Sequence, residues 1–249
     1  MDDEAPLLVR LGRQWRLVLE VIATLLVIAV AVQLMVAVGR TGSRPEPSRG
    51  GNEARPAKLP DQPLSLENAA AEGAKTAKVA LIEYSDYQCP DCGRFARETE
   101  PGLRKEYVES GRVLFAFRHL PLSIHQYAVR AAETTECARR QGKFWQLHDL
   151  LFANQQQLDD VSLRLRATAA KLDLNEFDAC FAGAALEQVK RDQMEATRLG
   201  ITSTPTFLVG VVQPDGRVKA RARFSGALPV DQFTKAIDQL LAEVGHDSK

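Results

Sequence analysis

Two cysteines with two residues between them stand between a strand-type run and a helix-type stretch. The run Val79–Tyr84 is short and apolar, which is typical of a buried strand. Cys89 and Cys92 follow after a brief loop. Pro90, directly after the first cysteine, suits the first position of a helix, where the missing N–H of proline removes no hydrogen bond. This order predicts a strand, a loop and a helix that begins at the cysteine pair.

The next residues complete a strand–helix–strand unit. Apolar residues at helical spacing between Phe95 and Tyr107 predict a helix that runs to Gly111, with a bend at Pro101. The apolar run Val113–Phe117 predicts a second strand. Because a crossover helix joins the two strands, we expect them to pair in parallel.

A helical block separates this unit from a second one. Apolar residues recur at helical spacing over Tyr127–Leu199. The period then changes to that of strands at Thr206–Val209 and at Val218–Phe224, with a Pro-Asp-Gly turn between them. An amphipathic stretch over Phe233–Val244 predicts a closing helix. The order βαβ, helices, ββα predicts an α/β fold.

The cysteine pair has the placement that thiol chemistry needs. The unpaired N–H groups and the dipole of a helix N-terminus stabilise an anion. We therefore expect Cys89 to be exposed, to have a lowered pKa and to act as the nucleophile. Cys92 lies one turn further into the helix, where it can close a disulfide with Cys89 or resolve a mixed one.

Other uses of a cysteine pair fit less well. Covalent haem attachment needs a histidine after the second cysteine, and Gly93 stands there. A zinc site needs two further ligands at close spacing, but Cys137 and Cys180 are 43 residues apart. A purely structural disulfide across two residues would remove little chain entropy. The sequence therefore favours redox chemistry of the cysteine pair over a metal site, a haem attachment site or a structural disulfide.

The charge balance argues against a nucleic-acid partner. Lys and Arg together number 32, as do Asp and Glu, so the formal net charge is zero. Phosphate backbones need a basic face, and this composition provides no excess of basic residues for one.

An uncharged run precedes the globular part. Val21–Gly39 holds no charged residue, and the helix that it predicts would span roughly 27 Å, close to the ~30 Å hydrocarbon core of a membrane. We expect one transmembrane anchor at residues 17–39. A cleaved secretory signal is the alternative, because Ala37-Val38-Gly39 is a passable cleavage site.

The remaining boundaries follow from the anchor. Residues 1–16 form the segment before it, and residues 40–63, rich in Pro, Gly, Arg and Glu, predict a flexible tether. Residues 64–249 are enough for one domain. Arginines flank the span equally on both sides, so the positive-inside rule leaves the orientation open.

Four stretches resemble the DsbA-like thiol–disulfide oxidoreductases, specifically their membrane-anchored branch. They are Glu83–Cys92, Arg118–Leu122, Gly142–Trp145 and Gly200–Phe207. The resemblance covers nearly all of Leu64–Lys249 and implies a thioredoxin-like fold with a helical insertion at about 123–200.

The resemblance also assigns roles to individual residues. Pro205 matches the cis-proline that faces the active disulfide, and Thr204 would present its backbone to the cysteines and to a bound substrate. Glu83 matches the buried acid that moves a proton for the inner cysteine. Without the resemblance, Pro205 would be expected in trans and Glu83 on a solvated face.

The function implied by the resemblance is disulfide exchange with exported cysteine-containing polypeptides, without a bound cofactor. We expect an oxidase in preference to a reductase or isomerase, although the sequence leaves the direction of electron flow open. A membrane redox partner of the DsbB or VKOR type would reoxidise or reduce the pair. The domain would face the periplasmic or extracytoplasmic side of the cytoplasmic membrane, with residues 1–16 in the cytoplasm. The alternative is a non-catalytic binding or chaperone module with the same fold.

The second pair of cysteines lies in the helical block. Cys180 shares an apolar helical face with Phe177 and Phe181, and Cys137 lies in a preceding helix. We predict a structural disulfide between them, which an oxidising compartment would maintain. Two buried free thiols are the alternative.

Asp91 departs from the Cys-Pro-His-Cys pattern of the most oxidising relatives. A carboxylate beside Cys89 should destabilise its thiolate and raise the pKa of Cys89 by roughly one unit, at a separation of ~6 Å and an effective dielectric constant of ~40. The sequence therefore predicts a weaker oxidant than the histidine-bearing relatives.

Overall fold

The computed structural model describes residues 58–246 and five isolated positions, 25, 28, 29, 31 and 33. The chain divides into two units, Met1–Glu53 and Ala54–Lys249. The five isolated positions are helical, and the rest of the expected anchor lies outside the described residues, as does the tether up to residue 57. No helix within the described residues has the length and apolar character needed to cross a membrane.

The second unit is built on one five-stranded sheet with the order β1-β3-β2-β4-β5. The strands are β1 (Ala70–Glu72), β2 (Val79–Ser85), β3 (Val113–His119), β4 (Thr206–Val212) and β5 (Val218–Ser225). β2 and β3 pair in parallel, as their crossover helix predicts, and the other neighbours pair antiparallel. Every residue of β2 is buried because strands flank it and helices cover both faces. This central strand leads directly into the cysteine pair.

The crossover between β2 and β3 is broken into three helical pieces. They are α2 (Pro90–Glu98), α3 (Glu100–Leu103) and a π-helical turn (Arg104–Val108). The break falls at Thr99, two residues before Pro101, where we expected a bend. Proline has no N–H for the helical ladder and restricts the residue before it, so the interruption falls on the N-terminal side of the proline.

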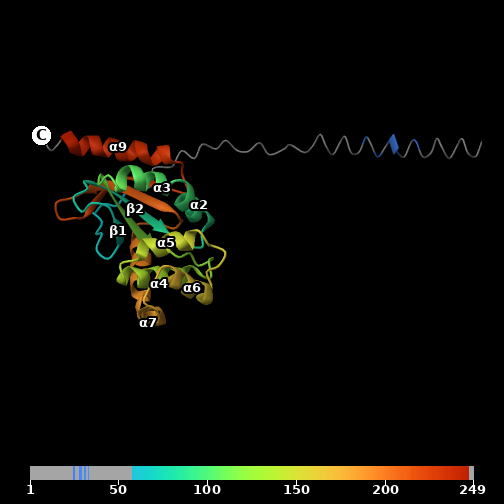
Figure 1. Cartoon of the computed structure of the whole chain (residues 1–249). Coiled ribbons are helices and arrows are strands. Elements are labelled where there is room, and N and C mark those ends of the chain that lie inside the picture. Colours follow the sequence, from blue (N-terminus) through green and yellow to red (C-terminus); the bar gives the residue numbers. More distant parts are fainter. Residues whose placement is uncertain (1–24, 26–27, 30, 32, 34–57, 247–249) are drawn as a thin grey trace, which may run out of the picture. The chain divides into compact units, whose positions relative to one another are not determined.

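Helices cover the two faces of the sheet (Figure 1). The C-terminal helix α9 (Val230–His246) lies with α2 and α3 on one face. The core on that side consists mainly of Leu81, Phe95, Phe115, Phe207, Phe233 and Ile237. The opposite face packs against α8 (Leu186–Arg198) and the segment before β1.

The segment between β3 and β4 is helical, and its hydrophobic core also includes Tyr87, Cys89, Cys92 and Phe117 of β3. It contains α4 (Ala128–Arg140), α5 (Phe144–Phe152), α6 (Asp160–Ala169), α7 (Leu174–Ala179), a π-helical turn (Cys180–Ala184) and α8. The sulfurs of Cys137 and Cys180 are bonded at 2.08 Å inside this block. The fold is therefore α/β and thioredoxin-like, with a helical insertion between its βαβ and ββα halves.

Trp145 of α5 forms the junction between the insertion and the sheet. Its ring stacks on Phe115 of β3 at 5.3 Å between centroids. The guanidinium of Arg104 lies over the same ring, 4.6 Å from its centroid.

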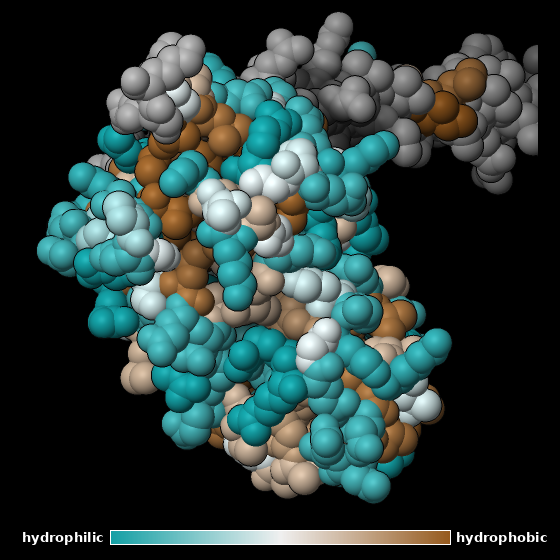
Figure 2. Space-filling view, turned by 60° about the vertical axis from the view of Figure 1, so that its left-hand side comes forward, coloured by the Kyte–Doolittle hydropathy of each residue, from teal (hydrophilic) through white to brown (hydrophobic). Residues whose placement is uncertain are grey.

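On the face shown in Figure 2, hydrophilic residues cover most of the surface and hydrophobic residues gather in narrow bands.

Candidate active site

A single buried carboxylate holds the loop that leads from β2 to the cysteines. Asp86 accepts hydrogen bonds from the backbone N–H of Gln88 at 2.7 Å and of Leu122 at 2.8 Å. Its second oxygen also lies 2.7 Å from Nδ1 of His125. The loop is thus tied to the segment that follows β3, and Cys89 enters α2 as its N-cap residue, with φ −71° and ψ 124°.

Cys89 is less accessible than we expected. The residue is 7% exposed, because residues distant in sequence pack over the end of α2. Its Sγ lies 3.5 Å from the carbonyl oxygen of Thr204. The placement at the N-terminus of α2 is as predicted, but the prediction of an exposed thiol was wrong. The sulfur is held in a narrow contact between α2 and the loop before β4.

The environment of Cys89 stabilises its thiolate. A hydrogen bond from the Cys92 side chain is the largest influence that lowers the pKa of Cys89, from 9.0 to about 6, while burial opposes it. Thr204 and the backbone N–H groups of Asp91 and Cys92 lower this pKa further. At neutral pH the Cys89 sulfur is therefore mainly the anion, which is the nucleophilic form.

Cys92 has the opposite environment. It is 0% exposed, and both active-site cysteines are free thiols in this structure. Burial raises the pKa of Cys92 well above its ordinary value, and its hydrogen bond to Cys89 and the Cys89 charge add to this. The two thiols thus differ in acidity, so the pair has one ready nucleophile and one thiol that needs a base before it can react.

Thr204 and Pro205 come from the loop before β4. The peptide bond between them is cis, and Thr204 is 8% exposed. The carbonyl of Pro205 accepts a hydrogen bond from the N–H of Gly226 at 2.8 Å, which ties this loop to the end of β5. The structure thus brings Thr204 and Pro205 to the cysteine pair across more than a hundred residues of chain.

Glu83 lies on β2, beneath the cysteines, between Phe117 of β3 and Phe207 of β4 in the sheet register. It is 0% exposed, and neither carboxylate oxygen has a hydrogen-bond partner among the described residues. Burial raises the pKa of Glu83 from 4.5 to about 8, and the charge of Cys89 contributes in the same direction. At neutral pH Glu83 is a protonated acid whose titration is linked electrostatically to that of both cysteines.

Asp91 is paired within its own helix. Its carboxylate lies 3.0 Å from the guanidinium of Arg94, and both side chains are about half exposed, at 50% and 51%. The positive charge of Arg94 and the surrounding solvent both weaken the effect of this carboxylate on Cys89. Asp91 should therefore raise the pKa of Cys89 by less than an unpaired carboxylate at the same place would.

One residue at this site has no signal in the sequence. Gln155, in the loop after α5, donates hydrogen bonds from Nε2 to the backbone carbonyls of Tyr87 at 2.9 Å and Cys89 at 2.8 Å. A lone glutamine in a polar loop gives no indication of a contact 66 residues away. Only the fold brings the insertion to the active-site loop.

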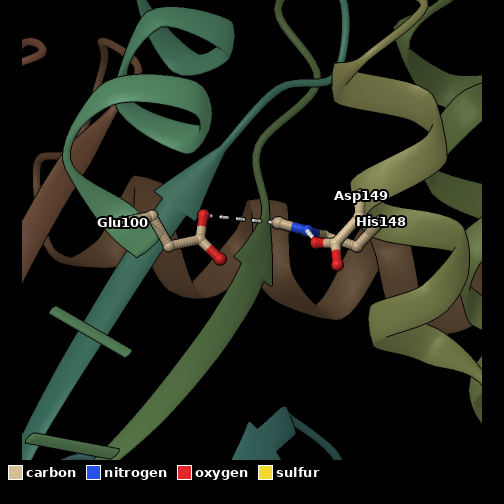
Figure 3. Close-up of side chains that lie close together, drawn as sticks. All are labelled: Glu100, His148 and Asp149. Atoms are coloured by element: carbon tan, nitrogen blue, oxygen red, sulfur yellow. Dashed lines mark hydrogen bonds and ion pairs between the residues drawn. The ribbon is translucent and has the colours of Figure 1, made fainter. Parts of the chain in front are cut away.

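A second polar cluster joins α3 and α5 (Figure 3). Glu100 of α3 faces His148 of α5, with 3.8 Å between carboxylate and Nε2, and the other ring nitrogen lies 2.9 Å from Asp149. These are metal-ligand residue types. Arg104 contacts Glu100 at 3.0 Å and Asp149 at 3.4 Å, so an arginine supplies the positive charge between the two carboxylates. Burial raises the pKa of Glu100 to about 7. We interpret the cluster as a charge network of the fold.

A thiol pair of unequal acidity, held at a helix N-terminus against a cis-proline loop, places the chain among the thioredoxin-fold thiol–disulfide oxidoreductases. The helical insertion between β3 and β4 makes it DsbA-like.

Comparisons with known proteins agree with this class. A family model described as "Thioredoxin" matches residues 65–239. The crystal structure of Wolbachia pipientis alpha-DsbA1 superposes with a TM-score of 0.67 at 25% identity, over 75% of this chain and 97% of that one. Oxidised BdbD from Bacillus subtilis superposes with a TM-score of 0.62 at 20% identity, over 74% of this chain and 99% of that one. The chain belongs to the thioredoxin family, as a DsbA-like member.

One curated relative is named as a sodium/proton antiporter. The Na(+)/H(+) antiporter NhaA 3 of Salinispora tropica is 37% identical over 151 residues, which are 59% of this chain and 22% of that protein. The chain thus spans about a fifth of the length of that relative.

Proposed function

We propose that the protein is a dithiol oxidase that introduces disulfides into exported cysteine-containing polypeptides. The observation that supports this proposal is the placement of Cys89 as the N-cap residue of α2 beside the cis-proline loop, which lowers the pKa of its thiol. Stabilising the thiolate stabilises the reduced form of the pair, and a pair whose reduced form is stable is a stronger oxidant. Cys92 and Glu83 are both buried, and the charge of Glu83 acts on Cys92. Glu83 can therefore give a proton to the Cys92 thiolate and take one from the Cys92 thiol.

The exchange then follows in two displacements. A substrate thiolate attacks Sγ of Cys89 in the oxidised pair, the Cys89–Cys92 bond breaks, and Cys92 leaves as a thiolate that takes its proton from Glu83. A second thiolate of the substrate then attacks the substrate sulfur that is bonded to Cys89. This closes the substrate disulfide and releases Cys89 as a thiolate. The two substrate thiols release their protons to solvent when they become thiolates, and Glu83 regains its proton from solvent. The substrate gains a disulfide and loses the two electrons that the pair gains.

The cis-proline loop has a role in this scheme. Thr204 borders the Cys89 sulfur through its carbonyl oxygen. We assign Thr204 and Pro205 to holding the substrate backbone beside the cysteines. Pro90 fixes the start of α2, and Asp91 moderates the potential of the pair.

We propose an extracytoplasmic location for this domain. The support is the bond between Cys137 and Cys180, since structural disulfides persist in oxidising compartments, and the uncharged run Val21–Gly39. Residues 1–16 would then be cytoplasmic, residues 17–39 a single-pass anchor and residues 40–63 a tether to the domain at 64–249. A membrane redox partner of the DsbB or VKOR type would reoxidise the pair. A reporter enzyme fused after Lys249 tests the topology: activity confined to the cytoplasm would refute it.

An oxidative refolding assay tests the function. Reduced, unfolded ribonuclease is mixed with the oxidised full chain in detergent, and recovery of ribonuclease activity is followed. We expect recovery with the native chain and none with Cys89→Ser. A non-catalytic binding or chaperone module, the second candidate, would give equal results with both chains. A chain that reduces insulin but leaves ribonuclease unoxidised would instead indicate a reductase.

A further inference from the structure

The carboxamide of Gln155 connects the helical insertion to the backbone of the nucleophile. Its single nitrogen donates to the carbonyl oxygens of Tyr87 at 2.9 Å and Cys89 at 2.8 Å. An amide NH2 has two hydrogens, so one group satisfies both carbonyls. The carbonyl of Cys89 also accepts the first helical hydrogen bond of α2, from the N–H of Gly93 at 3.1 Å. Gln155 is therefore a second donor to this carbonyl, and through it the insertion adds two bonds to the backbone of the active-site loop.

The other end of the carboxamide is fixed as well. Arg97 donates from Nη1 to Oε1 of Gln155 at 3.2 Å, and the same nitrogen donates to the carbonyl of Phe152 at 3.1 Å. A flipped amide would place its NH2 against the guanidinium and its oxygen against two carbonyls, pairing like groups with like. The orientation in which Gln155 donates to the loop is therefore determined by its surroundings.

Gly93 leaves the space that this contact needs. A β-carbon at position 93 would lie 1.8 Å from Oε1 and 2.5 Å from Cδ of Gln155. Glycine inside a helix is less favourable for stability than alanine, so the space at position 93 has a cost for the helix. Any larger residue at position 93 would displace the carboxamide and break its two bonds to the loop.

We propose that Gln155 is a positioning residue for the redox reaction, which holds Cys89 in its N-cap conformation and so keeps its sulfur beside the N–H groups at the start of α2. The Cys89 backbone is extended while the residues after it are helical, so rotation at Cys89 moves its sulfur relative to the N–H groups of Asp91 and Cys92. Those groups stabilise the thiolate. Fixing the carbonyl of Cys89 restricts that rotation.

The consequence is a link between the insertion and the reactivity of the thiol. Loss of the carboxamide donors should raise the pKa of Cys89 by about half a unit to one unit, the equivalent of one ordinary hydrogen bond. It should also make the pair a weaker oxidant, because the reduced form loses stability. The second statement rests on the proposed function, whereas the first concerns the free protein.

The test uses Gln155→Met, which keeps the side-chain length and removes the donors. Gln156→Met, at the exposed neighbouring position, is the matched control. The Cys89 pKa is measured in the full chain, with the active-site pair reduced, from thiolate absorbance against pH and without any substrate. We expect an upward shift in Gln155→Met and none in Gln156→Met. An unchanged pKa in a Gln155→Met chain with native circular dichroism would refute the proposal.

Gly93→Ala provides an independent test, and decides the matter alone if Gln155→Met does not fold. It should shift the Cys89 pKa in the same direction, and the double variant should shift it no further than Gln155→Met does, because both changes remove the same bonds. Additive shifts would refute the shared cause. If the native chain fails to oxidise ribonuclease while these pKa shifts appear, the proposed function is wrong and the role of Gln155 stands.

Discussion

Replacement of Glu83 by glutamine should make folding stability less sensitive to pH. In the unfolded chain this carboxyl group ionises with its ordinary pKa of 4.5, whereas in the fold burial raises the pKa to about 8. Below pH 4.5 the group is neutral in both states. Between pH 4.5 and 8 the unfolded state releases its proton and the folded state retains it, so the free energy of unfolding falls as pH rises through this window.

The size of the effect follows from the two pKa values. From pH 4 to pH 7 the native chain should lose about 3 kcal/mol of unfolding free energy through Glu83, because each pKa unit corresponds to ~1.4 kcal/mol. Full burial of the side chain means that solvent screens little of this cost. The glutamine in Glu83→Gln is neutral at every pH, so that variant should lack this loss.

Urea unfolding at pH 4 and pH 7 measures the difference. The comparison is made in a Cys89→Ser/Cys92→Ser background, which removes the thiolate charge and the need for a reductant, so that the bond between Cys137 and Cys180 stays intact. The packing cost of the amide cancels because it is the same at both pH values. The reasoning would be refuted if the stabilities of the chains with and without Glu83→Gln ran parallel across this range.

Three further predictions concern the cysteines and their neighbours. Thiolate absorbance of the reduced protein should titrate with a pKa of about 6 and vanish in Cys89→Ala; a midpoint near 9.0 would contradict the stabilisation described for this thiol. Asp91→His should raise the reduction potential in glutathione equilibration, by less than ~30 mV because Arg94 already offsets the carboxylate; a lower potential would contradict the electrostatic argument. Removing the 43-residue crosslink with Cys137→Ala/Cys180→Ala should lower the unfolding free energy by about 3–4 kcal/mol in urea titrations, and an unchanged midpoint would contradict it.

The local parts of the site could be predicted from the sequence because neighbouring residues determine them. An apolar strand, a proline at the first helical position and two cysteines one turn apart are enough to place a thiol at a helix N-terminus. The parallel pairing of β2 and β3 follows from a crossover helix in the same way. The resemblance to DsbA-like proteins, rather than any local signal, pointed to Glu83 and Pro205.

The parts that could not be predicted depend on distant segments. The cover over Cys89 comes from Thr204 and from the insertion, which no spacing near the cysteines indicates. The edge strand β1 has only three residues, too few to show an alternating pattern. The position of the helix break at Thr99 depends on the backbone restriction that Pro101 imposes, for which the sequence indicated only an approximate place.

The contact of Trp145 with Phe115 and Arg104 makes the domain suitable for a single-site optical measurement. The sequence holds two tryptophans, and Trp15 lies well before the domain, so a chain shortened to begin at residue 58 has one indole. That indole lies where the insertion meets the sheet, and its emission reports the separation of these two parts. Circular dichroism reports mainly the helices. Coincident unfolding curves from both signals would mean that sheet and insertion unfold as one cooperative unit, whereas an earlier fluorescence change would mean that the insertion detaches first.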